Sequence, residues 1–298
     1  MQKVLVTGSE GFIGSAVSKY LRNLDFDVCG VDINMARPDK SNFQVDITSP
    51  NMNELIERIR PNFIIHIAAQ IQVSESFINP RNDLIINAWG TLNLVQSALS
   101  NGVDNFCYIN SGGAIYDQSG QLPVTESSLV KPLSPYGASK YLGEEYLRIL
   151  SSENSMRWSS LALSNCYGPI NIHKKGVIYS LATSITSDQA PEIYGSDVTR
   201  DFIYISDVTD AIACAMKIPS MSRVNISSGI ETSLLELYKE ISASLNFKKE
   251  AKISESRPGE IVRSCLSNEK ARQLWGWSPK IDIKTGINLA LHSKEWDS

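Results

Sequence analysis

The chain has 298 residues, of which 42% are hydrophobic, and it carries a formal net charge of -4 at pH 7. This length is sufficient for a large core in one or two domains. A weakly acidic chain without a basic run does not suggest nucleic acid or an anionic membrane as a partner. Because no apolar stretch is long enough to span a bilayer, and the first short apolar run is interpreted as a strand, we expect a soluble, cytoplasmic protein.

The cysteines and histidines give no indication of a metal centre. The cysteines stand singly, without a close pair or a neighbouring histidine, so we expect reduced thiols. The histidines share no helix face or short spacing, and neither a metal site nor a histidine-based triad is predicted. These residues are Cys29, Cys107, Cys166, Cys214, Cys265, His66, His173 and His292.

A glycine-rich turn comes directly after the first hydrophobic run. Residues 4–6 lead into the segment TGSEGFIG at 7–14, after which apolar residues recur at helical spacing. This pattern predicts a strand, a tight turn and the start of a helix. The glycines allow the backbone to approach a diphosphate, which the free amides and the positive dipole end of the helix bind. A structural turn also uses Gly8 and Gly11, so the loop is interpreted together with the second hydrophobic run.

The second hydrophobic run, residues 28–31, ends in Asp32. At about twenty residues beyond the glycine loop, a carboxylate can accept both hydroxyls of an adenosine ribose, which favours NAD over NADP. Arg37 lies a few residues further on and would soften that preference if its loop folds back. An aspartate that simply ends a strand is the alternative.

Apolar runs alternate with helical patterns through the first half of the chain. The runs lie at residues 4–6, 28–31, 43–45, 63–67, 106–109 and 158–163, and the helical stretches include 52–59, 85–100 and 135–150. Such alternation predicts an α/β fold of Rossmann type with a doubly wound parallel sheet.

After Asn165 the pattern loosens. Residues 201–205 lead into a helical stretch at 208–216, a further core segment lies at 233–245, and Trp275 and Trp277 indicate a packed turn near the end. We therefore expect an NAD-binding domain at residues 1–165, with a later contribution from about 198–218. Residues 166–298 are expected to form mainly a smaller C-terminal substrate domain.

Tyr136 and Lys140 are four residues apart in the segment PYGASK at 135–140. On a helix that begins near Pro135 they lie on one face, one turn apart. An ammonium beside a phenol lowers the pKa of the phenol from about 10 toward neutrality, which makes Tyr136 a usable general base for a sugar hydroxyl. The same spacing occurs by chance on solvated helices, so the upstream glycine loop is what gives the pair its meaning.

The order of these motifs resembles that of the extended short-chain dehydrogenases/reductases over nearly the whole chain. Further matching segments are Asp46-Ile47, HIAA at 66–69, NAWGT at 87–91 and NCYGP at 165–169. Within that superfamily the chain is most similar to the nucleotide-sugar epimerases. The segments RDFI at 200–203 and RPGE at 257–260 match those that hold the nucleoside diphosphate of the sugar donor.

The resemblance implies roles for the matching residues. Asp46 and Ile47 are expected to contact adenine, and Ala68 and Ala69 to let the chain pass close to the cofactor. The implied NAD-binding residues are Gly8, Gly11, Phe12, Ile13, Gly14, Asp32, Asp46, Ile47, Ala68, Ala69, Asn87, Tyr136 and Lys140. The implied substrate-binding residues are Asn165, Arg200, Arg257 and Ser264. Family members usually pair into a homodimer through the segments at 134–150 and 87–99.

The arginines agree with this assignment on physical grounds. Arg200 and Arg257 can each offer paired donors to a diphosphate, as a guanidinium does. Each is equally well explained, taken singly, as a surface arginine. Asp201 is a possible partner that orients Arg200.

The chain departs from the family pattern at two positions. Gly112 stands four residues before Tyr116, where relatives usually place a serine or threonine that hydrogen-bonds the reacting sugar oxygen. Ser111 lies one residue earlier, and in a regular strand this shift points a side chain to the opposite face. Because the strand ends there, a flexible backbone can bring Ser111 or a bound water into place, and we predict Ser111 as a catalytic residue. Ala162 replaces an arginine of many relatives, so one possible anchor is missing.

The predicted reaction is a transient oxidation at C4 of a nucleotide-activated hexose. Tyr136 removes the proton of the 4-hydroxyl, Lys140 stabilises the phenolate and holds the nicotinamide ribose, and the 4-keto sugar takes its hydride back on the other face. The resemblance also places Ser264, seven positions after Arg257, beside the C2 substituent of the sugar, where a small residue admits an N-acetyl group. The predicted function is therefore NAD-dependent 4-epimerisation of a UDP-hexose or a UDP-N-acetylhexosamine.

Three other functions remain as alternatives to this one. A 4-keto nucleotide-sugar reductase would use the same tyrosine and lysine, but it usually prefers NADPH, which Asp32 disfavours. A 4,6-dehydratase needs an acid and a base that Gly113 and Ala114 cannot supply. A non-catalytic NAD-binding protein on the same fold is supported only by Gly112 and Ala162, and the intact pair of Tyr136 and Lys140 argues against it.

Overall fold

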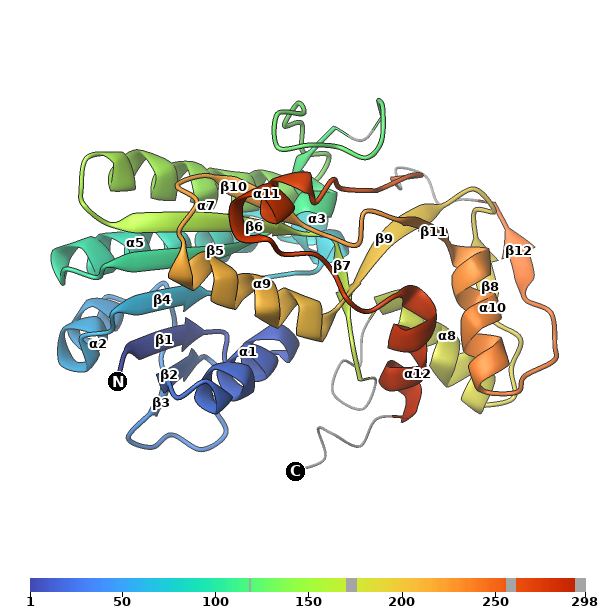
Figure 1. The fold of residues 1–298 in the computed structure, drawn as a ribbon, viewed down its shortest axis with the longest axis horizontal. Helices are drawn as coiled ribbons and strands as arrows, with labels where there is room; N and C mark the ends of the chain where they lie inside the picture. The colour runs from blue at the N-terminus through green and yellow to red at the C-terminus, as the bar shows by residue number, and fades with distance from the viewer. Residues whose placement is uncertain (118, 170–175, 256–260, 293–298) are drawn as a thin grey trace.

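A seven-stranded parallel sheet forms the centre of the molecule. The computed structural model describes residues 1–117, 119–169, 176–255 and 261–292. The strands lie in the order β10-β6-β5-β4-β1-β2-β3, so the order reverses between β1 and β4, as in a doubly wound sheet (Figure 1). This confirms the Rossmann-type α/β fold. The strands are β1 (Lys3–Thr7), β2 (Asp27–Asp32), β3 (Asn42–Gln44), β4 (Phe63–His66), β5 (Asn105–Ser111), β6 (Arg157–Leu163) and β10 (Arg223–Ile226).

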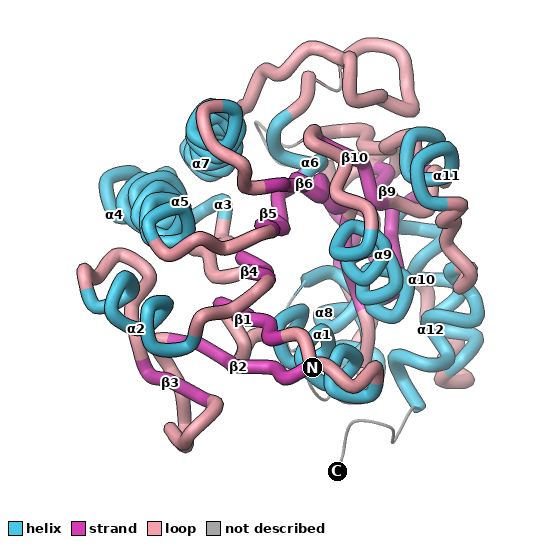
Figure 2. Tube along the Cα trace, turned by 60° about the vertical axis from the view of Figure 1, so that its left-hand side comes forward, coloured by secondary structure: helices cyan, strands magenta, loops and turns pink. Residues whose placement is uncertain are grey.

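Helices cover both faces of this sheet, as Figure 2 shows. On one face lie α1 (Phe12–Asn23), α9 (Ile205–Lys217) and α11 (Glu269–Trp275), and on the other α2 (Asn51–Ile59), α5 (Gly90–Ser100) and α7 (Pro135–Ser152). Strand β1 shows why two cores form. Val4 and Val6 belong to one buried cluster and Leu5 to the other, because successive side chains of a strand point to opposite faces. Both faces are apolar, as expected for a sheet buried on both sides.

A smaller unit comes after β6 and lies beside the carboxyl end of the large sheet (Figure 1). It contains a three-stranded sheet in the order β11-β9-β7 and a two-stranded sheet of β8 and β12. A third apolar cluster joins them to the surrounding helices. The elements are β7 (Asn165–Tyr167), β8 (Glu192–Tyr194), β9 (Thr199–Tyr204), β11 (Glu231–Ser233), β12 (Lys252–Ser254), α8 (Gly176–Thr186), α10 (Leu234–Ser244) and α12 (Ile283–His292).

The tryptophans near the C-terminus form the packed turn that the sequence predicts. Trp277 is buried, and its indole N–H donates to the carbonyl oxygen of Asp207 at 3.2 Å. Trp275 donates in the same way to the carbonyl oxygen of Ile218 at 2.8 Å. Both hydrogen bonds tie this segment to α9, so it packs with α9 on one face of the large sheet.

Several elements differ from the predicted ones. The helical stretch expected at 85–100 begins as a π-helix, η1 (Ile85–Trp89), which continues into α5. The short helices α3 (Val73–Ile78), α4 (Pro80–Leu84) and α6 (Gly112–Ile115) and the strand β10 have no counterpart in the prediction. Each is too short to show a period, and β10 owes its burial to pairing with β6, a contact between distant segments.

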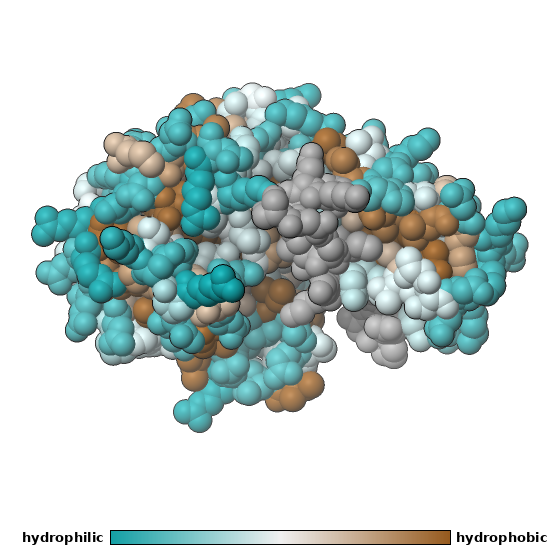
Figure 3. All heavy atoms as spheres, turned by 90° about the horizontal axis from the view of Figure 1, so that it is seen from below, coloured by the Kyte–Doolittle hydropathy of each residue, from teal (hydrophilic) through white to brown (hydrophobic). Residues whose placement is uncertain are grey.

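No helix within the described residues is long and apolar enough to cross a membrane. On the face drawn in Figure 3, hydrophilic side chains cover most of the surface and apolar side chains form separate patches.

Gly286 should tolerate no side chain, because α12 packs closely against β7. A Cβ atom at Gly286 would lie 1.9 Å from the hydroxyl oxygen of Tyr167 and 2.8 Å from its Cζ, and Tyr167 is buried. We expect Gly286→Ala to lower the free energy of unfolding by about 1–3 kcal/mol in urea titrations, as overpacking does. Gly120→Ala is the matched control, since nothing lies within 4 Å of its Cβ position. Equal stability of both variants would contradict this packing.

Candidate active site

The glycine loop has no room for side chains at its closest contacts. Gly8 has a φ of +71°, and a Cβ atom there would lie 2.7 Å from the backbone nitrogen of Ala68. A Cβ atom at Gly14 would lie 1.9 Å from the carbonyl oxygen of Gly8. Because β1 and β4 are neighbours on either side of the point where the strand order reverses, the loop, the start of α1 and the end of β4 meet there.

This arrangement fits a dinucleotide. Helix α1 begins directly after Gly11, has no acidic residue in its first turn and has no side-chain cap. The first amides of a helix have no partner within it, and together with the helix dipole they attract phosphate groups. The absence of side chains at Gly8, Gly11 and Gly14 leaves the backbone open for that approach.

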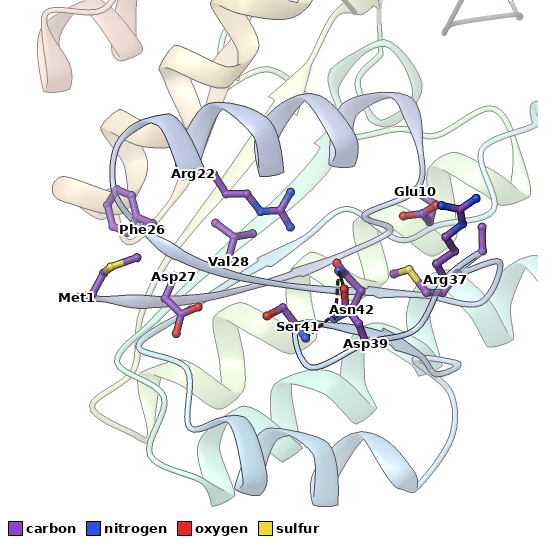
Figure 4. A pocket seen from close by; sticks show the side chains of 12 residues that line it. Met1, Glu10, Arg22, Phe26, Asp27, Val28, Arg37, Asp39, Ser41 and Asn42 are labelled. Atoms are coloured by element: carbon purple, nitrogen blue, oxygen red, sulfur yellow. Dashed lines mark hydrogen bonds between the residues drawn. The ribbon is translucent and has the colours of Figure 1, made fainter. Parts of the chain in front are cut away.

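Asp32 is fixed beside the loop by two backbone amides. Its Oδ2 accepts from the N–H of Glu10 at 3.0 Å and its Oδ1 from the N–H of Asn34 at 2.9 Å, and the side chain is only half-buried. Glu10 and Arg37 line the same pocket, and Figure 4 draws them at the same end of it. The loop of Arg37 therefore does fold back toward the glycine turn.

The other residues predicted to contact adenine and the cofactor lie along the same edge of the sheet. The Oδ1 of Asp46 accepts from both the N–H and the hydroxyl of Thr48 at 2.8 Å, which fixes the turn. Ile47 is buried, and its Cδ1 would lie 2.8 Å from a Cβ atom at Gly90. Ala68 and Ala69 are half-buried at the end of β4. The predicted contact residues therefore form two groups at one edge of the sheet. Asp32, Asp46 and Ile47 lie on the β2 side of β1, and Ala68 and Ala69 lie on the β4 side.

Tyr136 and Lys140 lie in the first two turns of α7, and both are buried. Ser134 caps this helix, since its hydroxyl accepts from the N–H of Gly137 at 3.1 Å, and Pro135 occupies the first turn. The Nζ of Lys140 lies 4.1 Å from the centroid of the Tyr108 ring. The hydroxyl of Tyr108 donates to the carbonyl oxygen of Lys140 at 3.1 Å, so Tyr108 contacts the lysine at both ends.

The pKa values of the pair correct the sequence-based expectation. Burial lowers the pKa of Lys140 to about 7, although the carboxylates of Glu144 and Asp83 favour its charged form. Burial also raises the pKa of Tyr136 to about 12, and a hydrogen bond with the Ser111 side chain only partly offsets this. The prediction that the pKa of the Tyr136 phenol falls toward neutrality is therefore wrong for the protein alone, because desolvation and the Asp83 carboxylate both raise this pKa.

The turn after β5 shows why position 112 is a glycine. A Cβ atom at Gly112 would lie 2.3 Å from the Cδ1 of Leu266, which is fully buried. Leu266 thus occupies the place of a side chain at position 112. The Ser111 side chain lies close enough to the Tyr136 phenol to lower its pKa, and Ser264 is buried with its hydroxyl oxygen 3.8 Å from a Cβ position at Gly113.

A buried carboxylate that the sequence did not reveal lies behind the pair. Asp83 accepts from the hydroxyl of Ser139 at 2.5 Å and from the side-chain amides of Gln70 at 2.8 Å and Asn87 at 3.1 Å. The Oδ1 of Asn87 in turn accepts from the backbone N–H of Gln70 at 2.9 Å. The only signal in the sequence is the place of Ser139 next to Lys140. Asn87 therefore ties α7 to the loop after β4, and its contact with a cofactor stays a prediction.

Two of the predicted substrate residues, Asn165 and Arg200, lie on the neighbouring strands β7 and β9. Asn165 is exposed and pairs in register with Phe202, two residues after Arg200. The guanidinium of Arg200 donates to the carbonyl oxygens of Thr199 at 2.8 Å and Val262 at 3.3 Å. Arg257 lies outside the described residues.

Asp201 has a different role from the one considered for it. Its carboxylate is buried and accepts from the N–H groups of Ser228 at 2.9 Å and Leu266 at 3.2 Å. Adjacent strand residues point to opposite faces, so Asp201 faces away from the side chain of Arg200. Asp201 therefore anchors the segment that carries Ser264 and Leu266 against the turn after β5.

His66 is buried and takes part in hydrogen bonds within the sheet. Its Nδ1 lies 2.7 Å from the hydroxyl of Thr7 and its Nε2 lies 3.0 Å from that of Thr91. Burial and the charge of Lys140 lower the pKa of the imidazole well below its usual value. Among the described residues no three histidine, cysteine, aspartate or glutamate side chains could hold a metal ion.

The fold, the glycine loop and the buried tyrosine–lysine pair together define a dinucleotide-binding protein of the Rossmann class. Residues 4–227 match the NAD dependent epimerase/dehydratase family, and the chain belongs to this family.

Known proteins of similar sequence and structure were found over almost the whole chain. A protein of Methanocaldococcus jannaschii that is named as a candidate UDP-glucose 4-epimerase is 37% identical, over 97% of each chain. The crystal structure of a UDP-glucose 4-epimerase from Thermotoga maritima with UDP-glucose has a TM-score of 0.92 at 29% identity, with 97% of each chain covered. That of a UDP-glucose 4-epimerase from Thermus thermophilus in complex with NAD has a TM-score of 0.89 at 28% identity, with 97% of each chain covered.

The buried amine of Lys140 should make stability depend on pH. Its folded-state pKa of about 7 lies below the ordinary 10.5, so between these values the unfolded chain binds more protons and stability rises with pH. We expect Lys140→Met to stabilise the NAD-free protein most at pH 7, with the advantage shrinking by about 1 kcal/mol per pH unit up to about pH 10. Urea unfolding between pH 7 and pH 9.5 measures this, with the exposed Lys217→Met as control. A pH-independent difference would refute the burial of a neutral amine.

Proposed function

We propose that this protein is an NAD-dependent 4-epimerase of a UDP-activated hexose. The observation that carries the proposal is the buried pair of Tyr136 and Lys140, with the Ser111 side chain close enough to the phenol to lower its pKa. The charge of Lys140 acts on His66, which hydrogen-bonds Thr7 at the start of the glycine loop. The similarity over 97% of the chain to UDP-glucose 4-epimerases with bound UDP-glucose or NAD supports the same conclusion.

The cofactor site of this proposal is formed by the glycine loop and the carboxyl ends of β1 to β4. The amides at the start of α1 would bind the diphosphate, and Asp32 would accept the hydroxyls of the adenosine ribose. Asp46 and Ile47 would contact adenine. When bound, NAD supplies an acceptor and donor of hydride.

The reacting sugar would lie between Tyr136 and the turn at Ser111. Tyr136 takes the proton of the 4-hydroxyl and later returns it, and Ser111 orients the sugar oxygen. Protonated Lys140 favours the phenolate of Tyr136 and so opposes the effect of burial on the phenol's pKa. Because the pKa of Lys140 is about 7, the amine can gain or lose its proton near neutral pH.

The nucleotide part of the substrate would be bound by the later part of the chain. We propose that residues 166–298 form mainly this binding unit and that Asn165, Arg200 and Arg257 contact the diphosphate or the sugar. A firm hold on the diphosphate and a looser hold on the ring would allow the oxidised sugar to present its other face.

We further propose that the enzyme is a cytoplasmic homodimer. Helices α5 and α7 pack side by side, and α7 exposes Leu142, Tyr146 and Ile149 at helical spacing. The nearby Trp89 at the end of η1 is also exposed. Exposed apolar side chains gathered in this way are typical of a surface that binds another copy.

The proposed reaction is tested by incubating the purified protein with NAD and UDP-glucose or UDP-galactose and following the products by proton NMR. We expect interconversion without net consumption of cofactor. Tyr136→Phe should reduce kcat by about 10²- to 10⁴-fold while NAD still binds, because only the general base is lost. Consumption of reduced cofactor by a 4-keto sugar would instead identify a reductase, and near-normal epimerisation by Tyr136→Phe would refute the assigned base.

Ser264 should decide which hexoses fit. The residue is buried beside Gly113. A serine is smaller than the tyrosine that would block an N-acetyl group, and it would offer a hydroxyl to the acetamide. We expect the unmodified protein to interconvert UDP-N-acetylglucosamine and UDP-N-acetylgalactosamine. Ser264→Tyr should reduce kcat/KM for this pair by about 10-fold or more and spare the pair without acetyl groups. The role is excluded if both pairs lose activity equally, or if the acetylated pair is never turned over.

A further inference from the structure

A buried network next to the active site has no part in the reaction as proposed so far. Glu144 lies one helical turn after Lys140 on α7 and is buried. Its carboxylate accepts from the guanidinium of Arg223, whose Nε is 2.9 Å from Oε1. It also accepts from the side-chain amide of Asn110 at 2.6 Å and from the hydroxyl of Ser160 at 2.5 Å. Four elements, β5, β6, β10 and α7, therefore meet at one carboxylate.

Asn110 connects this carboxylate to the catalytic turn. Its Nδ2 donates to Glu144, while its Oδ1 accepts from the backbone N–H of Ser111 at 2.8 Å. The charge of Glu144 sets this orientation, because a flipped amide would place its oxygen against the carboxylate and its NH₂ against the N–H of Ser111. A charge-assisted hydrogen bond to a buried carboxylate is stronger than a neutral one. The backbone at Ser111 is thus held in one position.

The position of the Ser111 backbone matters because few other side chains of this turn could place a hydroxyl beside Tyr136. Gly112 and Gly113 carry no side chain, and Leu266 occupies the space beside Gly112. The hydroxyl of Tyr116 is already engaged, because Tyr116 is buried and donates to the Oδ1 of Asn225 at 2.9 Å. Ser111 is therefore the residue of this turn whose hydroxyl can both contact Tyr136 and meet a substrate.

We propose that Asn110 is a positioning residue that ties the backbone of Ser111 to the buried ion pair of Glu144 and Arg223 and so holds the Ser111 hydroxyl against Tyr136. This inference rests on the proposed role of Tyr136 as base. Asn110 itself is buried and acts through Ser111 without touching the sugar. The ion pair serves as the rigid support, because the Arg223 guanidinium lies over the rings of Tyr116 and Tyr141 at 5.2 and 5.4 Å from their centroids.

The test is a double-mutant cycle on the full chain with NAD and UDP-glucose. Asn110→Leu and Ser111→Ala should each reduce kcat by about 10-fold with KM within about twofold, since a small displacement of an orienting group costs rate more than binding. The double variant should lose no more than about the larger single loss, because both changes remove one interaction. A double loss equal to the product of the single losses, or an unchanged kcat in Asn110→Leu, would overturn the proposal.

Two controls separate positioning from folding. Asn105→Leu replaces a buried asparagine of the same strand whose Oδ1 has no partner among the described residues, and it should leave kcat unchanged. If Asn110→Leu folds poorly, Asn110→Ser takes its place as the test variant. A serine is too short to reach both Glu144 and the N–H of Ser111, so it should cause the same loss of kcat. Equal losses in Asn105→Leu would assign the effect to the strand and overturn the proposal.

Amide hydrogen exchange on the same proteins does not depend on turnover. Exchange in residues 111–116 should be at least about 10-fold faster in Asn110→Leu and unchanged in Asn105→Leu, because the first variant frees the N–H of Ser111. If the unmodified protein turned over no nucleotide sugar, the proposed function would fail, and this measurement would still decide the role of Asn110. Unchanged exchange in Asn110→Leu would overturn it.

Discussion

The burial of the Lys140 amine between α7 and β5 is the constraint on which the rest of the site depends. An amine taken out of water must be neutral or find compensating groups, and here its pKa of about 7 shows that the compensation is partial. Asp83 and Glu144 supply negative charge, and the ring of Tyr108 faces the amine. Each carboxylate is itself satisfied by donors from neighbouring elements. These contacts fix α7 to the sheet at several points, and they thereby fix the position of Tyr136, which lies in the first turn of α7.

A second constraint joins the two parts of the chain. The Asp201 carboxylate accepts a hydrogen bond from the N–H of Leu266, and the Leu266 side chain fills the space beside Gly112. The segment of Ser264 therefore rests on the turn that comes after β5 and carries Ser111. In the proposed function, a few buried contacts would in this way couple sugar recognition by the later part of the chain to chemistry at α7. The glycine loop packs just as closely against the end of β4, since a Cβ atom at Gly8 would clash with the backbone of Ala68.

The sequence predicts the features that depend on local pattern. The parallel strands, the glycine turn and the helix with Tyr136 and Lys140 can be predicted from periods and spacings that a few residues display. The strand β10, the Asp83 network and the pair of Glu144 and Arg223 cannot, because they arise from contacts between distant segments. The raised pKa of Tyr136 is not predictable for the same reason: desolvation is a property of the packed fold. Gly112 is visible in the sequence as a departure, but only Leu266 explains it.

The central claim is that hydride leaves C4 of the sugar and returns to the same carbon. It is tested most directly with UDP-glucose carrying deuterium at C4, converted in ordinary water and analysed by proton NMR and mass spectrometry. The account predicts that the UDP-galactose formed keeps the deuterium at C4. Loss of the label to water would mean that a proton is abstracted from carbon, and it would contradict the account.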